Sequence, residues 1–388
     1  MRSISLHASR GINLVSGSGV HIFDDRGRRY LDMMTNYGVN ILGHSHPDVV
    51  AAISDQAARI TNVHQSFGSP AREEFLAALG SLLPSPLSSV SFGNSGAEAV
   101  EAALKYARVV TGRSTFVAMN RGYHGRSFGA LAVTGDRRYQ DPFAPMLEAV
   151  RHVPFDDLDA LGTVLDDSVA AVVLEPIQGE GGVRLPAGGY LRGVRERCDA
   201  AGALLILDEI QTGFRCGAPL ASTAEGVVPD ILCLSKGIAN GLPLSVTVTT
   251  DAVAAGIPRG SHGSTFAGGP LMCAAGAATL RVLADPGVHH RVREVGGRLQ
   301  EGLAGLAMPE IREVRGRGLM LALELKRPAT PVIRALQERG VLTLPAGTTS
   351  IRFLPPLLIE GSHVDEAVSA VGDAIEATRG QAMAGVTP

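Results

Sequence analysis

Short apolar runs that do not alternate with polar residues recur between residues 89 and 249. Helical spacing of apolar residues separates several of them, as in Ala97–Val110 and Tyr190–Ala201. Because strands that are apolar at every position are typical of sheets covered on both faces, the pattern predicts an α/β fold with a mostly parallel central sheet between helices. SVTVT alternates, so an antiparallel or edge position would suit it. The runs are SVSF (89–92), TFVAM (115–119), AAVVL (170–174), ALLIL (203–207), ILCL (231–234) and SVTVT (245–249).

The segments on either side of this region have different patterns. Residues 19–32 predict a hairpin, and helical spacing follows in 46–60 and 69–83. After about residue 285 we expect helices at 287–306, 331–339 and 363–378, a hairpin over 311–325, a strand in SIRFLPPL and a frayed tail, QAMAGVTP. This α+β pattern indicates a second, smaller domain. The predicted units are an N-terminal arm and hairpin (1–45) that is part of the small domain, a large domain (46–285) and a C-terminal small domain (286–388).

Composition narrows the classes of protein that fit. The chain has 388 residues, 45% of them hydrophobic, which is enough for a large core or two domains. A net charge of −3 gives no electrostatic case for nucleic acid or a membrane surface, and no apolar run has the length of a transmembrane helix. The N-terminus lacks the apolar core of a signal peptide. Four dispersed cysteines, Cys198, Cys216, Cys233 and Cys273, suggest neither a disulfide framework nor a metal site, so we expect a cytoplasmic enzyme.

Polar residues and glycines gather where four of the apolar runs end. SVSF leads into GNSGAEA, AAVVL into EPIQGEGG, ALLIL into DEIQTG, and ILCL into SKG. Ligands of open α/β sheets bind beyond the carboxyl ends of the strands. A single junction of this kind is ordinary, but four that supply carboxylates, an amine, glycines and small hydroxyls indicate one site built from several loops.

Each junction also has an ordinary structural interpretation. The turn before residue 97 could bind a phosphate at a helix N-terminus, or Asn94 or Ser95 could simply cap the helix with Glu98 completing a capping box. Asp208 could cap the next helix or lie against a cationic ring nitrogen. Taken alone, Lys236 is more readily a solvent-exposed lysine than a nucleophile. Together, these groups match what pyridoxal phosphate requires: a phosphate cradle, a carboxylate for the ring nitrogen and a Schiff-base lysine.

The motifs resemble a known family. GVHIFDDRGRRYLD, LGHSHP, NSGAEAVEAALKYAR, YHGRS, EPIQGEGG, LDEIQTGF, SKGIANGLPLS, HGSTF, RGRGLM and IRFLPPL follow one another in the order found in class III (ω-type) pyridoxal-phosphate aminotransferases of the acetylornithine/ornithine group. The similarity covers nearly the whole chain and implies a fold-type I transferase. GVNILGHSHP, IPRGSHGSTF and the short N-terminus resemble most the branch that acts on lysine or ornithine attached to a small amino-group carrier protein.

The resemblance implies a cofactor site for pyridoxal 5'-phosphate. Lys236 would form the Schiff base and Asp208 would hold the pyridinium nitrogen. The remaining implied set consists of Ser95, Gly96 and Ala97 at the phosphate, Tyr123 and Ile210 on the two ring faces, Gln211 at the ring hydroxyl, His124, and Thr265 from a second subunit. A shared site of this kind implies a homodimer or a dimer-based oligomer.

The implied substrate residues are Tyr37, Arg126, Glu180 and Arg352. Arg126 would hold the carboxylate at the non-reacting end of the substrate, and Arg352 the α-carboxylate of 2-oxoglutarate. Glu180 would pair with Arg352 while an amine is bound; for Arg352 alone, a structural salt bridge is the alternative. The departures from the family pattern concern the amino substrate: the usual N-terminal tyrosine is missing near His7 and Ala8, Ser127 replaces a threonine, and Gly269 replaces an asparagine.

The expected reaction moves a terminal amino group to 2-oxoglutarate, giving a semialdehyde and glutamate. The donor would resemble acetylornithine, ornithine or lysine, free or carrier-bound. The alternatives are an aminomutase, against which the Glu180–Arg352 pair speaks, an aminotransferase of secondary metabolism, and a cofactor-free binding or regulatory protein. A nicotinamide oxidoreductase is disfavoured because no strand is followed by GxGxxG. No metal, nucleic acid or membrane partner is expected.

Overall fold

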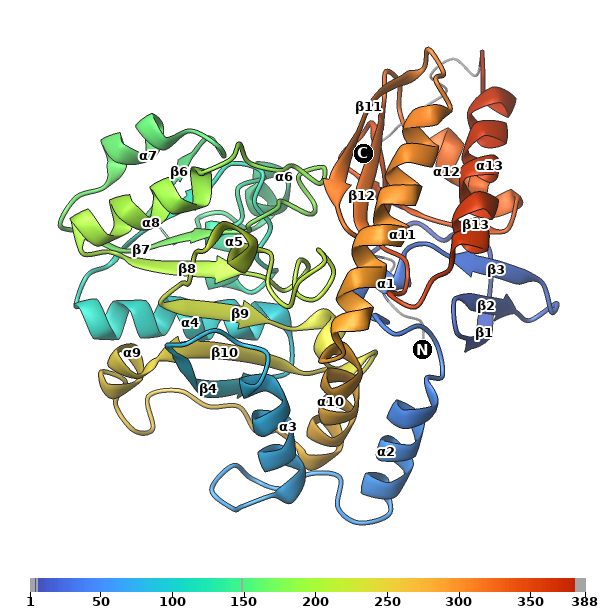
Figure 1. Ribbon diagram of the computed structural model, residues 1–388. Coiled ribbons are helices and arrows are strands. Elements are labelled where there is room, and N and C mark those ends of the chain that lie inside the picture. The colour runs from blue at the N-terminus through green and yellow to red at the C-terminus, as the bar shows by residue number, and fades with distance from the viewer. Residues whose placement is uncertain (1–3, 5, 148, 381–388) are drawn as a thin grey trace.

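The computed structural model describes residues 4, 6–147 and 149–380, which form two lobes (Figure 1). The larger lobe contains a seven-stranded sheet in the order β4-β10-β9-β8-β7-β5-β6. Only β10 runs antiparallel to its neighbours, so the predicted mostly parallel sheet is confirmed. The strands are β4 (Leu87–Gly93), β5 (Thr115–Met119), β6 (Val150–Val153), β7 (Val169–Leu174), β8 (Leu204–Asp208), β9 (Ile231–Leu234) and β10 (Ser245–Thr250).

Strand β10 corrects one expectation about the alternating run. It lies between β4 and β9, so its antiparallel direction is confirmed and the edge position is wrong. Its alternation comes from buried threonines rather than from a solvated face. Thr247 donates its hydroxyl to the Ala99 carbonyl of the covering helix at 2.9 Å, which satisfies the polar group without water.

Helices cover both faces of this sheet because successive strand residues point in opposite directions. Phe116 and Ala118 of β5 pack with Ala103 of α4, whereas Val117 and Met119 pack in the core on the other face. Helices α4 (Gly96–Thr111), α5 (Phe128–Val133) and α9 (Asp251–Ala255) lie on the first face, and α7 (Leu158–Val164) and α8 (Tyr190–Ala201) on the second. Helices α2 (Pro47–Ala57), α3 (Pro70–Gly80) and α10 (Pro270–Leu283) pack together beside the sheet. Short helical turns in the loops are α6 (Arg137–Gln140), η1 (Asp141–Phe143), η2 (Ser222–Glu225) and η3 (Lys236–Ala239).

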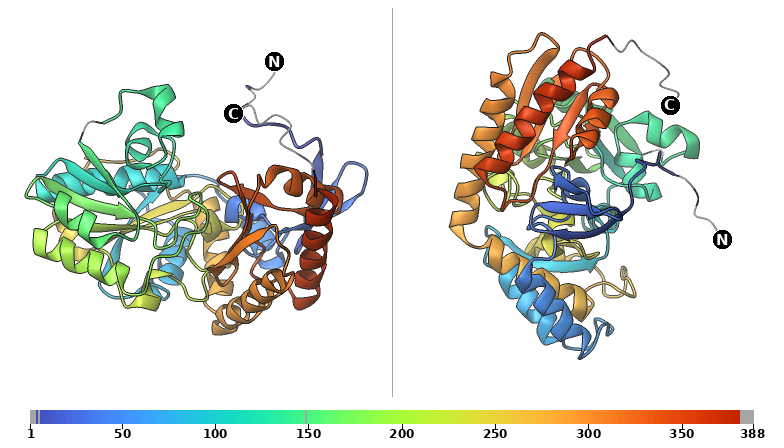
Figure 2. Two further views of the ribbon diagram at one scale, coloured as in Figure 1. Left: turned by 90° about the horizontal axis from the view of Figure 1, so that it is seen from above. Right: turned by 90° about the vertical axis from the view of Figure 1, so that its right-hand side faces the viewer.

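The smaller lobe joins the two ends of the chain. β13 pairs in parallel with β3, so the N-terminal strands share a sheet with a C-terminal one; in Figure 2 these strands lie against the C-terminal helices. The first sheet contains β1 (Leu14–Ser18), β2 (His21–Asp24), β3 (Arg29–Asp32) and β13 (Val341–Leu342). The second contains β11 (Ile311–Arg317), β12 (Met320–Leu325), β14 (Leu344–Ala346) and β15 (Ser350–Phe353). The helices are α1 (Thr35–Gly38), α11 (Pro286–Gly305), α12 (Thr330–Glu338) and α13 (Gly361–Ala377).

These elements match most of the predicted ones. The hairpin over 19–32, the hairpin over 311–325 and the three C-terminal helices are present, whereas β1, β6 and α10 were not predicted. The domain boundaries stay predictions, and the tail expected to fray (381–388) lies outside the described residues. Within the described chain, no single helix is both long and apolar enough to cross a bilayer; α10 and α11 meet that test only as a pair bent by 69°.

Arg215 lies where the two lobes meet and is fully buried. Its guanidinium donates to the carbonyls of Gly38 (3.3 Å), Leu319 (3.3 Å) and Pro355 (2.6 Å), which belong to three distant segments. Burial lowers the pKa of Arg215 to about 10. The side chain therefore ties the N-terminal segment and the C-terminal sheet to the loop after β8.

We expect Arg215→Met to destabilise the protein by about 3–5 kcal/mol, because three buried carbonyls would lose their donor. Thermal and urea unfolding measure the effect. The matched change on an exposed arginine of α11, Arg291→Met, should shift stability by about 0.5 kcal/mol or less. Equal effects of the two substitutions would show that the Arg215 contacts contribute little.

Candidate active site

A cavity of about 260 Å³ lies at the carboxyl ends of the central strands. It collects residues from four junctions that the sequence singled out and from the loop between β5 and α5. Its lining is Gly96, Ala97, Tyr123, His124, Gly125, Arg126, Glu175, Glu180, Asp208, Ile210, Gln211 and Lys236. Most of the predicted cofactor residues are thus brought together, and the strand-end rule located the cavity correctly.

Asp208, the last residue of β8, is held through both carboxylate oxygens. His124 Nδ1 donates to Oδ2 at 2.8 Å, and the Ile210 amide donates to Oδ1 at 3.0 Å. Burial opposes a charge on His124, but the hydrogen bond and the negative charge of Asp208 outweigh it, so the pKa of His124 is raised. The pair presents a fixed, buried carboxylate at the floor of the cavity.

Lys236 is the second residue after β9, following Ser235, and has a left-handed backbone conformation (φ 41°). That conformation is uncommon for a residue with a side chain and costs on the order of 1 kcal/mol or more. Burial lowers the pKa of Lys236, and the positive charge of Arg352 lowers it further. The negative charges of Glu180 and Asp208 act in the opposite direction. A lowered pKa leaves more of the amine neutral, which is its nucleophilic form.

The N-terminus of α4 forms another wall of the cavity. The Ser95 hydroxyl accepts from the Glu98 amide at 3.3 Å, so Ser95 caps the helix as predicted. The Glu98 carboxylate accepts from the Asn94 amide at 2.6 Å rather than from the Ser95 amide, so the predicted capping box is not closed. The first amides of the helix, at Gly96 and Ala97, have no intrahelical partners. Both residues line the cavity, where these amides and the helix dipole favour an anion.

Arg352 and Glu180 form an ion pair beside Lys236, with Nη2 and Oε1 2.8 Å apart. The Arg352 side chain is fully buried; it also donates to Gln211 Oε1 at 2.9 Å and lies 5.4 Å from the Tyr37 ring centre. Its Nε has no hydrogen-bond partner among the described residues. The salt bridge expected for Arg352 is therefore present, and it is made with the residue that the family resemblance assigned to it.

Arg126 lies at the mouth of the cavity and is exposed. Its guanidinium stacks 4.0 Å from the ring centre of Tyr139, and its Nε donates to the Tyr123 hydroxyl at 3.2 Å. Within the described part of the chain no carboxylate pairs with it. The stacking holds the guanidinium in place and leaves donors available to a carboxylate.

Comparison with known proteins decides the family. A family model described as "Aminotransferase class-III" matches residues 6–375. The chain belongs to the class-III aminotransferases.

Relatives of this class-III aminotransferase cover nearly all of it. A [LysW]-aminoadipate semialdehyde transaminase from Deinococcus radiodurans is 44% identical over 92% of this chain and 84% of its own length. An acetylornithine aminotransferase from Methanosarcina mazei is 42% identical over 93% of this chain and 91% of its own. The crystal structure of the ornithine aminotransferase from Toxoplasma gondii ME49 superposes with a TM-score of 0.91 at 33% identity, covering 98% of this chain and 93% of that one.

The class-III aminotransferase is a pyridoxal-phosphate enzyme of fold type I, as the resemblance implied. The donor set in the cavity fits the cofactor: an anion site at the start of α4, a buried carboxylate at Asp208 and an amine of lowered pKa at Lys236. An enzyme with ω-aminotransferase function is therefore confirmed, and the cofactor-free and oxidoreductase alternatives are set aside.

Some predicted residues lie apart from the cavity lining. Ser95 caps α4 at the margin of the cavity. Arg352 contacts the lining residues Glu180 and Gln211 from behind, and Tyr37 lies against Arg352. Thr265 is exposed in the segment before α10, and its predicted contact is with the cofactor of a second subunit. That contact stays a prediction. Gly269, where the family has asparagine, is the residue before α10 begins.

Glu175 is a buried carboxyl that the sequence-based site set did not include. It follows β7 directly, and its oxygens accept from the Tyr123 amide at 3.0 Å and the Gly179 amide at 2.9 Å. Burial raises the pKa of Glu175 to about 7 against the effect of His124, with Asp208 raising it further. Its position at a strand end is the same signal that singled out Asp208. Glu175 joins the loop of Tyr123 to the loop of Glu180.

The raised pKa of Glu175 predicts a pH-dependent stability. The unfolded carboxyl loses its proton near pH 4.5 and the folded one near pH 7, so wild-type stability falls across that window as pH rises. Relative to Glu175→Gln, the wild type should lose roughly 1–3 kcal/mol between these pH values, seen as a relative fall in Tm by calorimetry. Glu73→Gln, on an exposed residue of α3, should show no such trend. A Tm difference independent of pH for Glu175→Gln would contradict the assignment.

Proposed function

We propose that this enzyme moves the terminal amino group of an acetylornithine-, ornithine- or lysine-like donor to 2-oxoglutarate. The observation that carries the proposal is the unequal state of two arginines. Arg352 beside Lys236 is neutralised by Glu180, whereas Arg126 at the mouth has no carboxylate partner among the described residues. A donor with an amine at one end and a carboxylate at the other fits this arrangement, because its carboxylate binds Arg126 and its amine meets no free cation.

The second substrate uses the same residues in a different state. 2-Oxoglutarate carries carboxylates at both ends, so it requires Arg126 and Arg352 together. Glu180 is partly exposed and reaches Arg352 through a single ion pair, so it can move aside when a carboxylate competes for the guanidinium. An aminomutase transfers the amine within one molecule and binds no 2-oxoglutarate. It therefore does not require Arg352 to switch between pairing with Glu180 and binding a substrate carboxylate.

The site residues take the following roles in this proposal. Pyridoxal phosphate, when bound, supplies an electron sink next to the reacting carbon. Lys236 moves the proton from the amine-bearing carbon, which its lowered pKa favours. Asp208, held by His124, would provide the carboxylate that pairs with the ring nitrogen. The amides of Gly96 and Ala97 would bind the phosphate, Gln211 would hold the ring hydroxyl, and Tyr123 and Ile210 would pack on the ring faces.

The donor class and the assembly follow from the relatives and from exposed residues. One relative is named for a [LysW]-linked substrate, so a donor attached to a small carrier protein is included in the proposal. A homodimer is supported by the exposed Thr265 and by Phe266 beside it, whose exposed fraction is 68%. We place the enzyme in the cytoplasm, acting on small-molecule amines.

A donor panel tests the function. The enzyme, pyridoxal phosphate and 2-oxoglutarate are incubated with N-acetylornithine, ornithine, lysine, 4-aminobutyrate, or carrier-linked lysine or ornithine, and glutamate is measured. We expect glutamate from at least one donor that has a carboxylate at its far end, and none without 2-oxoglutarate. Repeated turnover of a donor in the absence of 2-oxoglutarate, beyond one equivalent per active site, would favour an aminomutase, and no glutamate from any donor would refute the proposal.

A further inference from the structure

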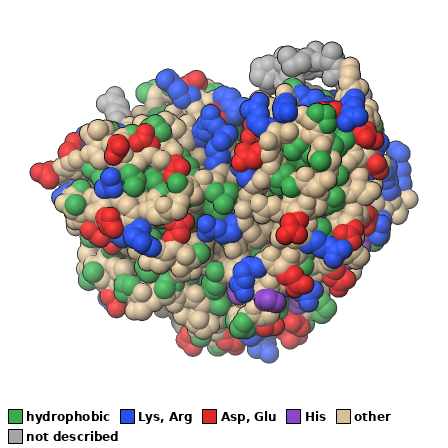
Figure 3. All heavy atoms as spheres, turned by 45° about the horizontal axis from the view of Figure 1, so that its top comes forward, with side chains coloured by type: hydrophobic (Ala, Val, Ile, Leu, Met, Phe, Trp, Pro, Cys, Tyr) green, Lys and Arg blue, Asp and Glu red, His purple; other side chains and the backbone are tan. Residues whose placement is uncertain are grey.

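The loop after β7 makes two polar contacts with the small lobe from residues that are two positions apart. Lys and Arg side chains gather along the hollow where the two lobes meet (Figure 3). One of the two contacts is the Glu180–Arg352 ion pair of the active site. The other joins the Gly182 carbonyl to Arg315 of β11. The first contact uses a side chain that lines the cofactor cavity, whereas the second uses only the backbone of the loop.

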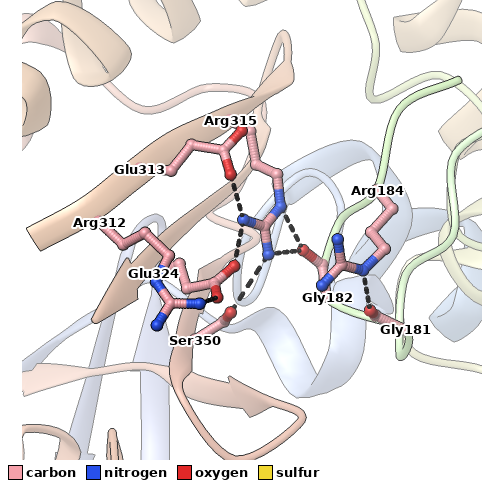
Figure 4. Close-up of polar contacts among 8 residues, drawn as sticks. All are labelled: Gly181, Gly182, Arg184, Arg312, Glu313, Arg315, Glu324 and Ser350. Atoms are coloured by element: carbon pink, nitrogen blue, oxygen red, sulfur yellow. Dashed lines mark hydrogen bonds and ion pairs between the residues drawn. The ribbon is translucent and has the colours of Figure 1, made fainter. Parts of the chain in front are cut away.

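Arg315 binds the loop and its own sheet through all three guanidinium nitrogens (Figure 4). Nε and Nη2 both donate to the Gly182 carbonyl, at 2.9 and 2.7 Å. Nη1 donates to Glu324 at 2.6 Å and to Glu313 at 2.9 Å. Arg315 is 9% exposed, so water competes little for these bonds. The guanidinium is therefore fixed by β11 and β12 and fixes the loop in turn.

Strand β15 lies behind both contacts. Ser350 and Arg352 are two residues apart in this strand, so their side chains point to the same side and lie about 7 Å apart. The Ser350 hydroxyl accepts from Arg315 Nη2 at 3.3 Å, and Ser350 pairs with Glu324 across the sheet. The contact at Arg315 therefore sets where the loop lies relative to Arg352.

The backbone of the loop has further attachments next to Gly182. Gln178 and Arg184 exchange backbone hydrogen bonds at 3.0 Å, which closes the loop at its base. Val183 is fully buried in an apolar cluster with residues of β12 and β14. Gly182 has a φ of 112°, and a Cβ there would lie 3.1 Å from Arg315 Nη2, so glycine allows the guanidinium to approach. Residues 182–184 are thus held against the small lobe.

Glu180 is attached far less firmly than the residues that follow it. Its side chain is 21% exposed, and its one ion pair among the described residues is with Arg352, at 2.8 Å. Rotation of the Glu180 side chain can therefore release Arg352 while residues 182–184 stay in place. Arg315 does not line the cofactor cavity, so it can influence a substrate only through the loop.

We propose that Arg315 is a positioning residue for the exchange of substrates: by holding Gly182 against the small lobe, it keeps Glu180 over Arg352 whenever no substrate carboxylate is bound there. The inference rests on the proposed function, in which Glu180 covers Arg352 for the amine donor and leaves it for 2-oxoglutarate. Arg315 supplies the fixed point that makes the covered arginine the resting state.

Loosening this contact should affect the two substrates in opposite directions. Without a fixed backbone, Glu180 has to find Arg352 from a larger set of loop conformations, so the ion pair is formed for a smaller part of the time. An unpaired Arg352 repels the ammonium group of the donor and attracts the second carboxylate of 2-oxoglutarate. The donor should therefore react less efficiently, and 2-oxoglutarate equally or more efficiently.

Arg315→Lys separates the loop contact from the buried ion pair. Lysine keeps a positive charge for Glu324, but it lacks the planar fork that places two donors on the Gly182 carbonyl. With the best donor of the panel, we expect kcat/KM for the donor to fall about tenfold, as for one lost charge-assisted hydrogen bond, and kcat/KM for 2-oxoglutarate to stay within about twofold or to rise. Each kcat/KM reports one half of the exchange, so the two effects are measured separately.

Hydrogen exchange provides a measurement that does not depend on turnover. In Arg315→Lys, mass spectrometry should show faster amide exchange in peptides that cover residues 177–184 and unchanged exchange in the rest of the large lobe. A general loss of stability would raise exchange throughout the lobe instead.

Arg312 offers a matched control on the same strand. It pairs with Glu324 at 3.3 Å from the exposed side and has no contact with the loop in Figure 4. Arg312→Lys should leave both kcat/KM values and the loop exchange near wild type. If Arg315→Lys does not fold, Arg315→Met/Glu324→Leu takes its place, because removing a buried ion pair as a unit is tolerated better than removing one partner.

The outcomes separate the positioning role from the function. An equal fall in kcat/KM for both substrates, or no change for either, overturns the role of Arg315, and so does the same split in Arg312→Lys. Unchanged hydrogen exchange in the loop of Arg315→Lys overturns it even where no donor reacts. No glutamate from any donor in the panel overturns the proposed function itself.

Discussion

Lys236→Ala is expected to end repeated turnover, lowering the rate of glutamate formation by about four orders of magnitude or more. The substitution removes both the nucleophile that holds the cofactor and the base that moves the proton, and general bases alone contribute about 10²–10⁴. Steady-state glutamate formation with the best donor measures the loss. Borohydride reduction followed by mass spectrometry should attach the cofactor's mass to the Lys236 peptide in wild type and to no peptide in the variant.

A matched lysine controls for general effects of removing an amine. Lys326, after β12, is exposed and does not line the cofactor cavity, so Lys326→Ala should keep wild-type turnover and the labelled Lys236 peptide. Many turnovers by Lys236→Ala at a rate near wild type would show that another group carries the chemistry.

Asp208→Asn is expected to lower kcat by about 10²–10⁴ while the fold is kept. Asparagine has nearly the same shape, but it removes the negative charge that raises the pKa of His124 and that stabilises a protonated ring nitrogen. Stopped-flow measurement of the first half-reaction, with the donor alone, separates the loss in the rate of the chemical step from any change in product release. Weaker retention of the cofactor during gel filtration should accompany it.

Asp230 offers a control at the opposite edge of the same sheet. It precedes β9 and accepts from Arg195 and from the Leu205 amide, each at 2.7 Å. Asp230→Asn should therefore lower stability and leave kcat near wild type. Similar kcat losses in both variants would mean that Asp208 acts through the fold rather than through the ring nitrogen.

The sequence was informative where burial alone decides structure. ILCL and AAVVL predicted strands because a strand covered on both faces must be apolar throughout, and the rule for strand ends then brought Asp208 and Lys236 together. β6 (VRHV) escaped prediction because its short run mixes polar and apolar residues. Of the two alternatives for β10, the antiparallel one was right, and the edge one failed because threonine is polar in the sequence and satisfied in the core.

The parts of the site that were not predicted depend on contacts between distant segments. Glu175 acquires its role only when the Tyr123 and Gly179 amides meet it. Thr265 has its predicted role only if a second chain is present. Spacing along one sequence contains none of this information.

The pairing of β3 with β13 has a consequence for the order in which the protein can form during synthesis. Leu31 leaves the ribosome long before Val341, its partner in the sheet, is made. The large lobe can therefore complete its sheet while the N-terminal strands still lack a neighbour. Throughout that interval β3 is an open edge, the kind of strand that pairs with other chains. We expect nascent chains truncated before residue 341 to depend on chaperones, and a short half-life for C-terminally shortened forms.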